Sequence, residues 1–281
     1  MRNTIAVMNT KGGVGKSTLV LALAETLSAK FAKNVLIIDS DAQASVSLML
    51  LSAGNLNRLQ LEGLTIVDLL VSTVLKNEPA DWPRFVVAGV SDVEEARSVF
   101  LIPSDMQLTL FEREVTGAQL LGKLRTSIGE LLGHVRGMFD IVLVDCPPGL
   151  SVLTESWLRE VDFLISPIKP DHLSAYALEV LGHFKGLNPE LGFAENLGVL
   201  INLKEVMSPE DAEHQRLLMA NAANRCFAQA VPRTGALQHA SHFAPTERSY
   251  GTKYPSDSAT AMHAVCQELL DRLAAANRAA T

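Results

Sequence analysis

The sequence contains little cysteine and no long apolar run. Its three cysteines, Cys146, Cys226 and Cys266, lie far apart and form no C-x-x-C pair, so zinc motifs, redox motifs and a disulfide framework have no support. No stretch of about 18 consecutive apolar residues occurs, and we therefore expect no membrane span. An apolar run already begins at Thr4, which leaves no room for a signal peptide, so we expect none. These absences together fit a protein of the reducing cytoplasm.

Length and charge narrow the class of protein further. A chain of 281 residues fits one large α/β domain or two small ones, and an apolar content of 48% is ample for a core. The formal net charge of −7 argues against a chain coated in positive charge, although it is compatible with a local basic patch.

Short apolar runs alternate with amphipathic stretches along the chain. Most of the runs are continuous in Val, Ile and Leu, which is typical of strands buried on both faces of a parallel sheet. We expect strands at Thr4–Met8, Asn34–Ile38, Val99–Ile102, Ile141–Val144, Phe163–Ile165 and Leu197–Ile201. We expect helices at Lys16–Ala29, Thr65–Lys76, Leu108–Val135, Ser174–Phe184, Pro209–Ala223 and about Ala259–Ala276. This alternation predicts an α/β fold with a doubly wound, mostly parallel sheet flanked by helices.

Three polar segments come directly after predicted strands: Lys11–Thr18, Asp39–Asp41 and Asp145–Pro148. In doubly wound sheets, ligands bind beyond the carboxyl ends of the strands. We therefore expect these segments to converge on one edge of the sheet and to form one site.

The first of these segments belongs to a glycine-rich turn, Asn9–Thr18, between a predicted strand and a predicted helix. The backbone N–H groups of such a turn and the dipole of the helix favour phosphate groups. Lys16 would reach the β- and γ-phosphates, and the Ser17 hydroxyl would ligate Mg²⁺. The strict pattern G-x-x-x-x-G-K-[ST] requires a glycine where Thr10 stands, and a lysine, Lys11, comes next. A glycine-rich turn without a ligand is the alternative.

The string K-G-G-V-G-K-S-T at Lys11–Thr18 resembles the deviant Walker A motif of the ParA/MinD family of P-loop ATPases, which have a SIMIBI-type fold. In that family the extra lysine contacts the nucleotide bound by the partner subunit. The resemblance therefore implies that Lys11 makes ATP the switch for a homodimer, and that Lys11 and Lys16 act in catalysis by neutralising charge. It also implies that ATP is bound, with Mg²⁺, by Lys11, Gly12, Gly13, Val14, Gly15, Lys16, Ser17 and Thr18.

The strand expected at Asn34–Ile38 leads into the sequence D-S-D-A-Q, where the family has D-x-D-P-Q. Asp39, Asp41 and Gln43 match this pattern, and Ala42 replaces the usual proline. By resemblance, Asp41 helps to position or activate the attacking water, and Asp39 lies on the metal side with Ser17. Two solvated acids at a strand end are the alternative.

The run Ile141–Gly149 resembles the Walker B strand of the family, which ends in D-x-P-P. By resemblance, Asp145 acts on the metal through water. Cys146 follows it, and we expect a packed thiol there, because no histidine that could activate it is near in sequence.

Two later positions resemble family elements that border the adenine base. Asn202 ends a predicted strand, where relatives often carry an asparagine that bonds the adenine edge, and Pro232-Arg233 resembles the family's I-P-R element. An ordinary loop cap and an ordinary turn are equal alternatives. The resemblance weakens after residue 203.

Three tasks are compatible with such a switch: segregation of plasmid or chromosome by an ATP dimer that binds DNA non-specifically, positioning of a protein cargo on the nucleoid, and MinD-like membrane binding. The C-terminal segment Asp271–Thr281 lacks the basic face and the Trp or Phe anchors of an interfacial helix, so we expect no membrane binding. The resemblance implies a nucleoid-associated cytoplasmic protein that a ParB-like or cargo-adaptor protein stimulates.

Residues 214–253 carry five basic residues against one acidic residue, a net charge of +4. Such a zone in an acidic chain is what non-specific phosphate binding would use. We name Arg216, Arg225 and Arg248 as candidate DNA contacts, with an ordinary solvated face as the alternative.

We expect one ATPase domain over residues 1–281, with a C-terminal helical portion at about 257–278. The phosphate loop begins at residue 9, so we expect no operator-binding domain before it. A metabolic ligase of the same superfamily is the alternative from a different class, although nothing in the sequence marks a second substrate pocket. Residues 77–97 contain Pro79, Trp82 and Pro83, and we interpret them as a surface excursion with no predicted role.

Overall fold

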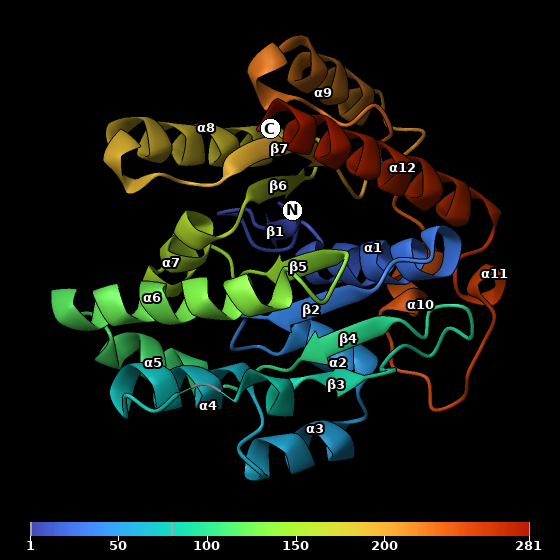
Figure 1. The fold of residues 1–281 in the computed structure, drawn as a ribbon. Helices are drawn as coiled ribbons and strands as arrows, with labels where there is room; N and C mark the ends of the chain where they lie inside the picture. Colours follow the sequence, from blue (N-terminus) through green and yellow to red (C-terminus); the bar gives the residue numbers. More distant parts are fainter. Residues whose placement is uncertain (1, 80, 281) are drawn as a thin grey trace.

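The computed structural model describes residues 2–79 and 81–280. They form a seven-stranded sheet in the order β3-β4-β2-β5-β1-β6-β7, with helices on both of its faces (Figure 1). β3 pairs antiparallel with β4, and every other neighbouring pair is parallel. The strands are β1 (Thr4–Val7), β2 (Val35–Asp39), β3 (Val87–Ala88), β4 (Val99–Ile102), β5 (Ile141–Asp145), β6 (Phe163–Ile168) and β7 (Glu195–Ile201). The predicted doubly wound, mostly parallel sheet is confirmed.

The central strands are continuous in apolar residues because both faces of the sheet are covered. Successive side chains of a strand point to opposite faces. In β2, Val35 and Ile37 therefore join the core beneath one layer of helices, and Leu36 and Ile38 join the core beneath the other.

The helices of the first layer are α1 (Lys16–Phe31), α2 (Ser45–Leu50), α3 (Ala53–Leu61), α10 (Gly235–Ala240), α11 (Tyr250–Lys253) and α12 (Ser256–Ala279). The helices of the second layer are α4 (Ile66–Leu70), the π-helical η1 (Val71–Leu75), the 3₁₀-helical η2 (Trp82–Phe85), α5 (Leu108–Glu114), α6 (Ala118–Val135) and α7 (Val152–Glu160). Near the β7 edge lie α8 (His172–Leu187), η3 (Pro189–Leu191), α9 (Pro209–Ala220) and η4 (Ala222–Asn224).

Several helix boundaries differ from the sequence-based predictions. The helix expected over Leu108–Val135 is two helices, because α5 ends at Glu114 and Gly117, in an extended conformation, caps the start of α6. α2, α3 and α7 were not predicted, because each has only six to nine residues, which is shorter than the window of about 11–18 residues over which helical periodicity is assessed.

The prediction of a surface excursion at residues 77–97 is wrong for much of the described part of this stretch, which packs against the core and supplies the edge strand of the sheet. Trp82 and Phe85 are buried in the core of the second layer, and β3 adds the antiparallel edge strand. Pro232, Pro245 and Pro255 suggest irregular chain for the stretch around residues 231–257, but α10 and α11 form within it.

Candidate nucleotide-binding site

The three predicted polar segments meet at one edge because their strands are neighbours. β2, β5 and β1 are adjacent in the sheet, and the register sets Asp145 opposite both Asp39 and Val7. The turn after β1, the carboxylate that ends β2 and the carboxylate that ends β5 therefore lie side by side. This is the edge where doubly wound sheets bind ligands.

The phosphate loop leads from β1 into the N-terminus of α1. Gly13 and Gly15 adopt left-handed backbone conformations, with φ of 75° and 79°. Gly15 is the N-cap of α1 and offers no side-chain acceptor, so no cap competes for the free N–H groups of the first turn. Asn9 ties the loop to the sheet, because its side chain accepts from Lys11 N at 2.8 Å and donates to the Pro167 carbonyl at 2.7 Å.

Lys16 begins α1 and is 7% exposed. Burial lowers the pKa of its ammonium group, and the nearby carboxylates of Asp145 and Asp41 act in the opposite direction. Among the other loop residues, Gly12 and Gly13 are exposed, Val14 is buried, and Ser17 and Thr18 are half-buried. The loop thus carries a largely desolvated cation close to the carboxylates of Asp145 and Asp41.

Asn202 lies against the phosphate loop. Its side-chain amide donates to the Val14 carbonyl at 2.9 Å. A Cβ atom on Gly15 would lie 2.7 Å from the Asn202 Nδ2 atom, so the residue at position 15 must lack a side chain for this contact to form. Pro232 runs beside the residues that follow β7, because it bridges to Lys204. The structure brings Asn202 and Pro232 to the same edge, and their predicted contacts with adenine stay predictions.

The two acidic residues after β2 are held by hydrogen bonds. Asp39 is fully buried and accepts from the Ser47 hydroxyl at 2.6 Å and from the Ser47 amide at 2.9 Å. Burial raises the pKa of Asp39 to about 6, and the Ser47 donors lower it in part. Asp41 is buried, and one of its carboxylate oxygens accepts from Gln43 N at 2.9 Å.

Asp145 is the most electrostatically costly group of the site. It is fully buried, and among the described residues neither carboxylate oxygen has a hydrogen-bond partner of good geometry. Burial and then the charge of Asp39 raise the pKa of Asp145 well above its ordinary value, and the Ser17 hydroxyl and Lys16 offset this only in part. A buried carboxylate without donors is costly unless a cation compensates it, so this donor set fits Mg²⁺.

Lys11 does not point away from its own subunit. Its ammonium group lies 3.0 Å from both carboxylate oxygens of Asp171 and 3.0 Å from the Ser174 hydroxyl, at the N-terminus of α8. Asp171 also caps α8 by accepting from Ser174 N at 2.7 Å. Burial alone would raise the pKa of Asp171, but the hydrogen bonds from Ser174 and Lys11 outweigh it and lower the pKa. Asp171 was not predicted from the sequence. It lies three residues after β6, and an acidic residue close to the carboxyl end of a strand is the same signal that identified Asp39.

Cys146 is fully buried beside Asp145, and burial raises the pKa of its thiol. This environment fits the predicted packed thiol.

The candidate DNA-contacting arginines lie apart from one another, and each has a carboxylate partner. Arg216 pairs with Glu213 at 2.7 Å, Arg225 with Glu195 at 3.2 Å and Arg248 with Asp92 at 2.8 Å. Arg216 is 67% exposed, Arg225 46% and Arg248 24%. Arg248 is therefore the least accessible of the three to a phosphate group.

The remaining basic residues of this zone also have partners. Arg233 pairs with Glu205 at 2.7 Å. Lys253 is buried and pairs with Glu25 at 2.8 Å and with Asp92. A count along residues 214–253 omits these partners, so the +4 overstates the positive charge that this surface presents.

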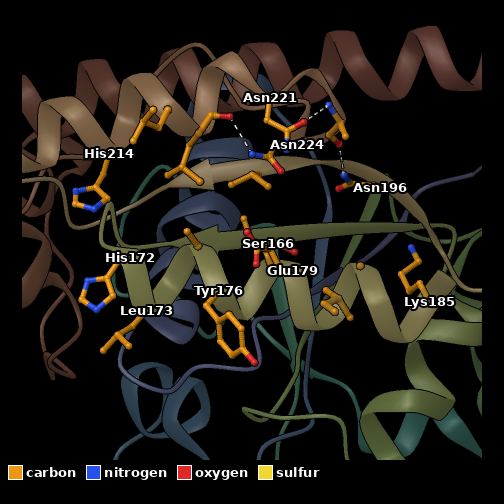
Figure 2. Close-up of a pocket in the computed structure, with 18 of the residues that line it drawn as sticks. Ser166, His172, Leu173, Tyr176, Glu179, Lys185, Asn196, His214, Asn221 and Asn224 are labelled. Carbon is orange, nitrogen blue, oxygen red and sulfur yellow. Dashed lines mark hydrogen bonds between the residues drawn. The ribbon is translucent and has the colours of Figure 1, made fainter. Parts of the chain in front are cut away.

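A groove of about 970 Å³ separates α8 from α9 above β6 and β7 (Figure 2). Apolar side chains line most of it, and His172 and His214 lie at one end. Leu173 and Tyr176 on its wall are more than half exposed. The phosphate loop and the three carboxylates do not line this groove, which the sequence did not predict.

Within residues 2–79 and 81–280, no helix combines the length and the apolar character that a bilayer crossing requires.

A family model described as AAA domain matches residues 2–188, well over half of the chain. The chain is 27% identical over 278 residues to the chromosome-partitioning ATPase Soj of Thermus thermophilus, and the match covers 96% of each chain.

Solved structures have the same fold at lower sequence identity. Cobyrinic acid a,c-diamide synthase of Mycobacterium smegmatis with bound ADP and magnesium is 21% identical with a TM-score of 0.74, over 96% of this chain and 94% of that one. A putative plasmid partition protein of Borrelia burgdorferi bound to AMPPNP is 20% identical with a TM-score of 0.70, over 96% of this chain and 99% of that one. The family match, the Soj relative and the phosphate-loop geometry agree with one another, and the chain belongs to the ParA/MinD family of P-loop ATPases.

Proposed function

We propose that this protein is an ATP-hydrolysing partition or positioning ATPase whose ATP-bound form is a homodimer. The observation that carries the proposal is the pair of lysines on the phosphate loop. Lys16 is buried among carboxylates inside the site, while Lys11 lies half-buried at the surface of the same loop, 3.0 Å from Asp171. In the proposed dimer, Lys16 serves the chain's own nucleotide, and Lys11 exchanges its contact with Asp171 for the nucleotide of the neighbouring subunit.

ATP binding is assigned to the loop residues 11–18, which would hold the phosphates, and to Asn202 and Pro232, which would contact the adenine base. Mg²⁺ would be held by Ser17, Asp39 and Asp145, and when bound it would neutralise charge on the phosphates. The described residues contain no group of three or more His, Cys, Asp or Glu side chains suited to a metal ion. This fits a cation that takes few protein ligands and completes its shell with phosphates and water. Solved relatives of this fold with bound ADP and magnesium, or with AMPPNP, support the assignment.

Hydrolysis is assigned to Asp41, which would orient the attacking water, with Lys16 and Lys11 stabilising the developing charge. We expect slow basal turnover, because the sequence offers no obvious arginine finger. A slow step is what a timed switch needs.

The dimer is proposed to bind DNA non-specifically through the exposed arginines Arg216 and Arg225, with Arg248 as the weakest of the three candidates. A ParB-like or cargo-adaptor protein would stimulate hydrolysis and release the dimer from the nucleoid. The Soj relative supports partition. Positioning of a protein cargo by the same cycle is the alternative, because the cargo depends on a partner encoded elsewhere. No membrane partner is proposed.

Residues 1–281 are proposed to form one ATPase domain, because the N-terminal α1 and the C-terminal α12 share the core of the first layer.

The test is binding to non-specific duplex DNA with ATP, with ADP and without nucleotide, across a salt series, for the wild type and for Asp41→Ala. ATP-dependent binding that weakens steeply with salt is expected. Binding that is absent with every nucleotide would contradict the DNA step.

A further inference from the structure

The loop after β4 contacts the acidic loop after β2. The two strands are neighbours, with Ile38 opposite Ile102, so their loops start side by side. Ser104, the second residue after β4, is fully buried. Its hydroxyl donates to the Asp41 carbonyl at 2.7 Å.

The backbone amide of Ser104 makes a second contact with the same loop. It donates to the Ser47 hydroxyl at 3.0 Å, and that hydroxyl donates to Asp39 at 2.6 Å. Because the hydroxyl oxygen of Ser47 accepts from Ser104, its hydrogen is directed toward the carboxylate. Ser104 is therefore joined to Asp41 directly and to Asp39 through one intermediate.

The turn that carries Asp41 has few other anchors. Ala44 adopts a left-handed conformation with φ of 50°, which is unfavourable for a residue with a side chain. The other hydrogen bonds of residues 41–44 are local, such as Ala44 N to the Asp41 carbonyl at 2.8 Å. Among the described residues, the bond from Ser104 is the one that ties this turn to a different loop.

We propose that Ser104 is a positioning residue for hydrolysis, which holds the Asp41 turn and orders the hydroxyl that serves Asp39. The inference rests on the proposed function, in which Asp41 orients the attacking water. Ser104 acts through Asp41 and touches no reacting atom. Loss of its hydroxyl lets the turn shift, and small displacements of an orienting group slow a reaction strongly.

The experiment compares Ser104→Ala with wild type in single-turnover ATP hydrolysis and in equilibrium binding of ATP and ADP. We expect hydrolysis to slow by about tenfold while both nucleotide affinities change by less than about twofold. The matched control is Ser127→Ala, which removes another buried hydroxyl: Ser127 lies on α6, and its hydroxyl is 2.5 Å from that of Thr73 on η1. It should hydrolyse ATP at the wild-type rate. Ser104→Cys preserves the side-chain volume but supplies a weaker hydrogen-bond donor, so it should hydrolyse ATP at an intermediate rate. This variant replaces Ser104→Ala in the test if the alanine variant does not fold.

The decisive comparison is the effect of Ser104→Ala in wild type against its effect in an Asp41→Ala background. If Ser104 acts through Asp41, Ser104→Ala slows hydrolysis no further in that background. A wild-type rate for both Ser104 variants, an equal loss of rate and affinity, or an undiminished effect in the Asp41→Ala background would each overturn the inference. If Asp41→Ala alone hydrolyses normally, the proposed role of Asp41 is wrong, and that result is distinguishable from a failure confined to Ser104.

Discussion

Lys11 and Asp171 form an ion pair at 3.0 Å that joins the phosphate loop to the N-terminus of α8. Each side chain is 30% exposed, so the pair is accessible and exchangeable. The lysine that family resemblance assigns to the partner's nucleotide is therefore bound within its own chain in this structure. In the proposed ATP dimer, this contact would be exchanged for a phosphate contact.

Neutralising Asp171 should favour the ATP dimer. Asp171→Asn preserves the oxygen that caps α8 but removes the charge that holds Lys11. A partly exposed ion pair contributes about 1 kcal/mol at most. Each of the two subunits gives up one such pair, so the dimer dissociation constant with ATP should fall by up to about 30-fold. Sedimentation of Asp171→Asn with a non-hydrolysable ATP analogue measures this.

Lys11→Ala is the paired variant. It should weaken the dimer, and adding Asp171→Asn to it should have no further effect because the ion pair is already absent. A Lys11→Ala protein that forms a normal ATP dimer and responds fully to its partner would remove Lys11 from the interface.

Asp41→Ala should trap the ATP-bound dimer. The carboxylate that orients water is lost, while the phosphate loop stays intact, so hydrolysis should fall by at least about 100-fold with little change in ATP affinity. Phosphate release and nucleotide binding, measured on the same preparation, separate the two effects. Undiminished phosphate release would show that another group orients the water.

Arg225→Glu should weaken non-specific DNA binding. Each lost phosphate contact lowers the salt slope by about one, and the slope is read from binding at several salt concentrations. Arg58→Glu is a matched control, because Arg58 is 62% exposed and pairs with Glu62 on α3, outside the proposed zone. Equal effects of the two substitutions would indicate that only the net charge of the protein matters. Unchanged binding by Arg225→Glu would show that the DNA-binding surface does not include Arg225.

Lys253→Met should strongly destabilise the fold. Lys253 compensates Glu25, which is fully buried on α1 and also accepts from Tyr254 at 2.6 Å and Ser91 at 2.7 Å. Removing one partner of a buried pair costs about 3–5 kcal/mol. Chemical denaturation gives the free energy of unfolding, and Glu25→Gln combined with Lys253→Met should recover much of the loss.

The same variant should be sensitive to pH. Burial raises the pKa of Glu25 above its ordinary value of 4.5, so the folded chain binds this proton more tightly than the unfolded chain. The contribution of Glu25 to stability is therefore present at low pH and is lost as pH rises above the unfolded value. Lys253 lowers the pKa of Glu25 in the wild type. Without Lys253 the loss of stability should therefore be larger and continue to a higher pH than in wild type, and an identical pH dependence would contradict this electrostatic account.

Local signals in the sequence predicted most of the sheet, the phosphate loop and the carboxylates of the site. Continuous Val, Ile and Leu runs identified every strand except the two-residue edge strand β3. Lys11–Thr18, Asp39, Asp41 and Asp145 stand at or just after the ends of three of these strands. In a parallel sheet the carboxyl ends share an edge, so chain position alone brings these groups together. The short helices α2, α3 and α7 were not predicted, because they are shorter than the window over which helical periodicity is assessed.

Only the tertiary structure decided which side chains pair across the chain. Lys11 contacts Asp171 over 160 positions, Ser104 contacts Asp41 over 63, and Lys253 contacts Glu25 over 228. No local pattern encodes such contacts. These contacts also reduce the positive charge that residues 214–253 present to solvent, since Lys253 is buried and pairs with Glu25. Charge counted along a chain records composition, whereas accessible charge depends on burial and on carboxylates brought in by the fold.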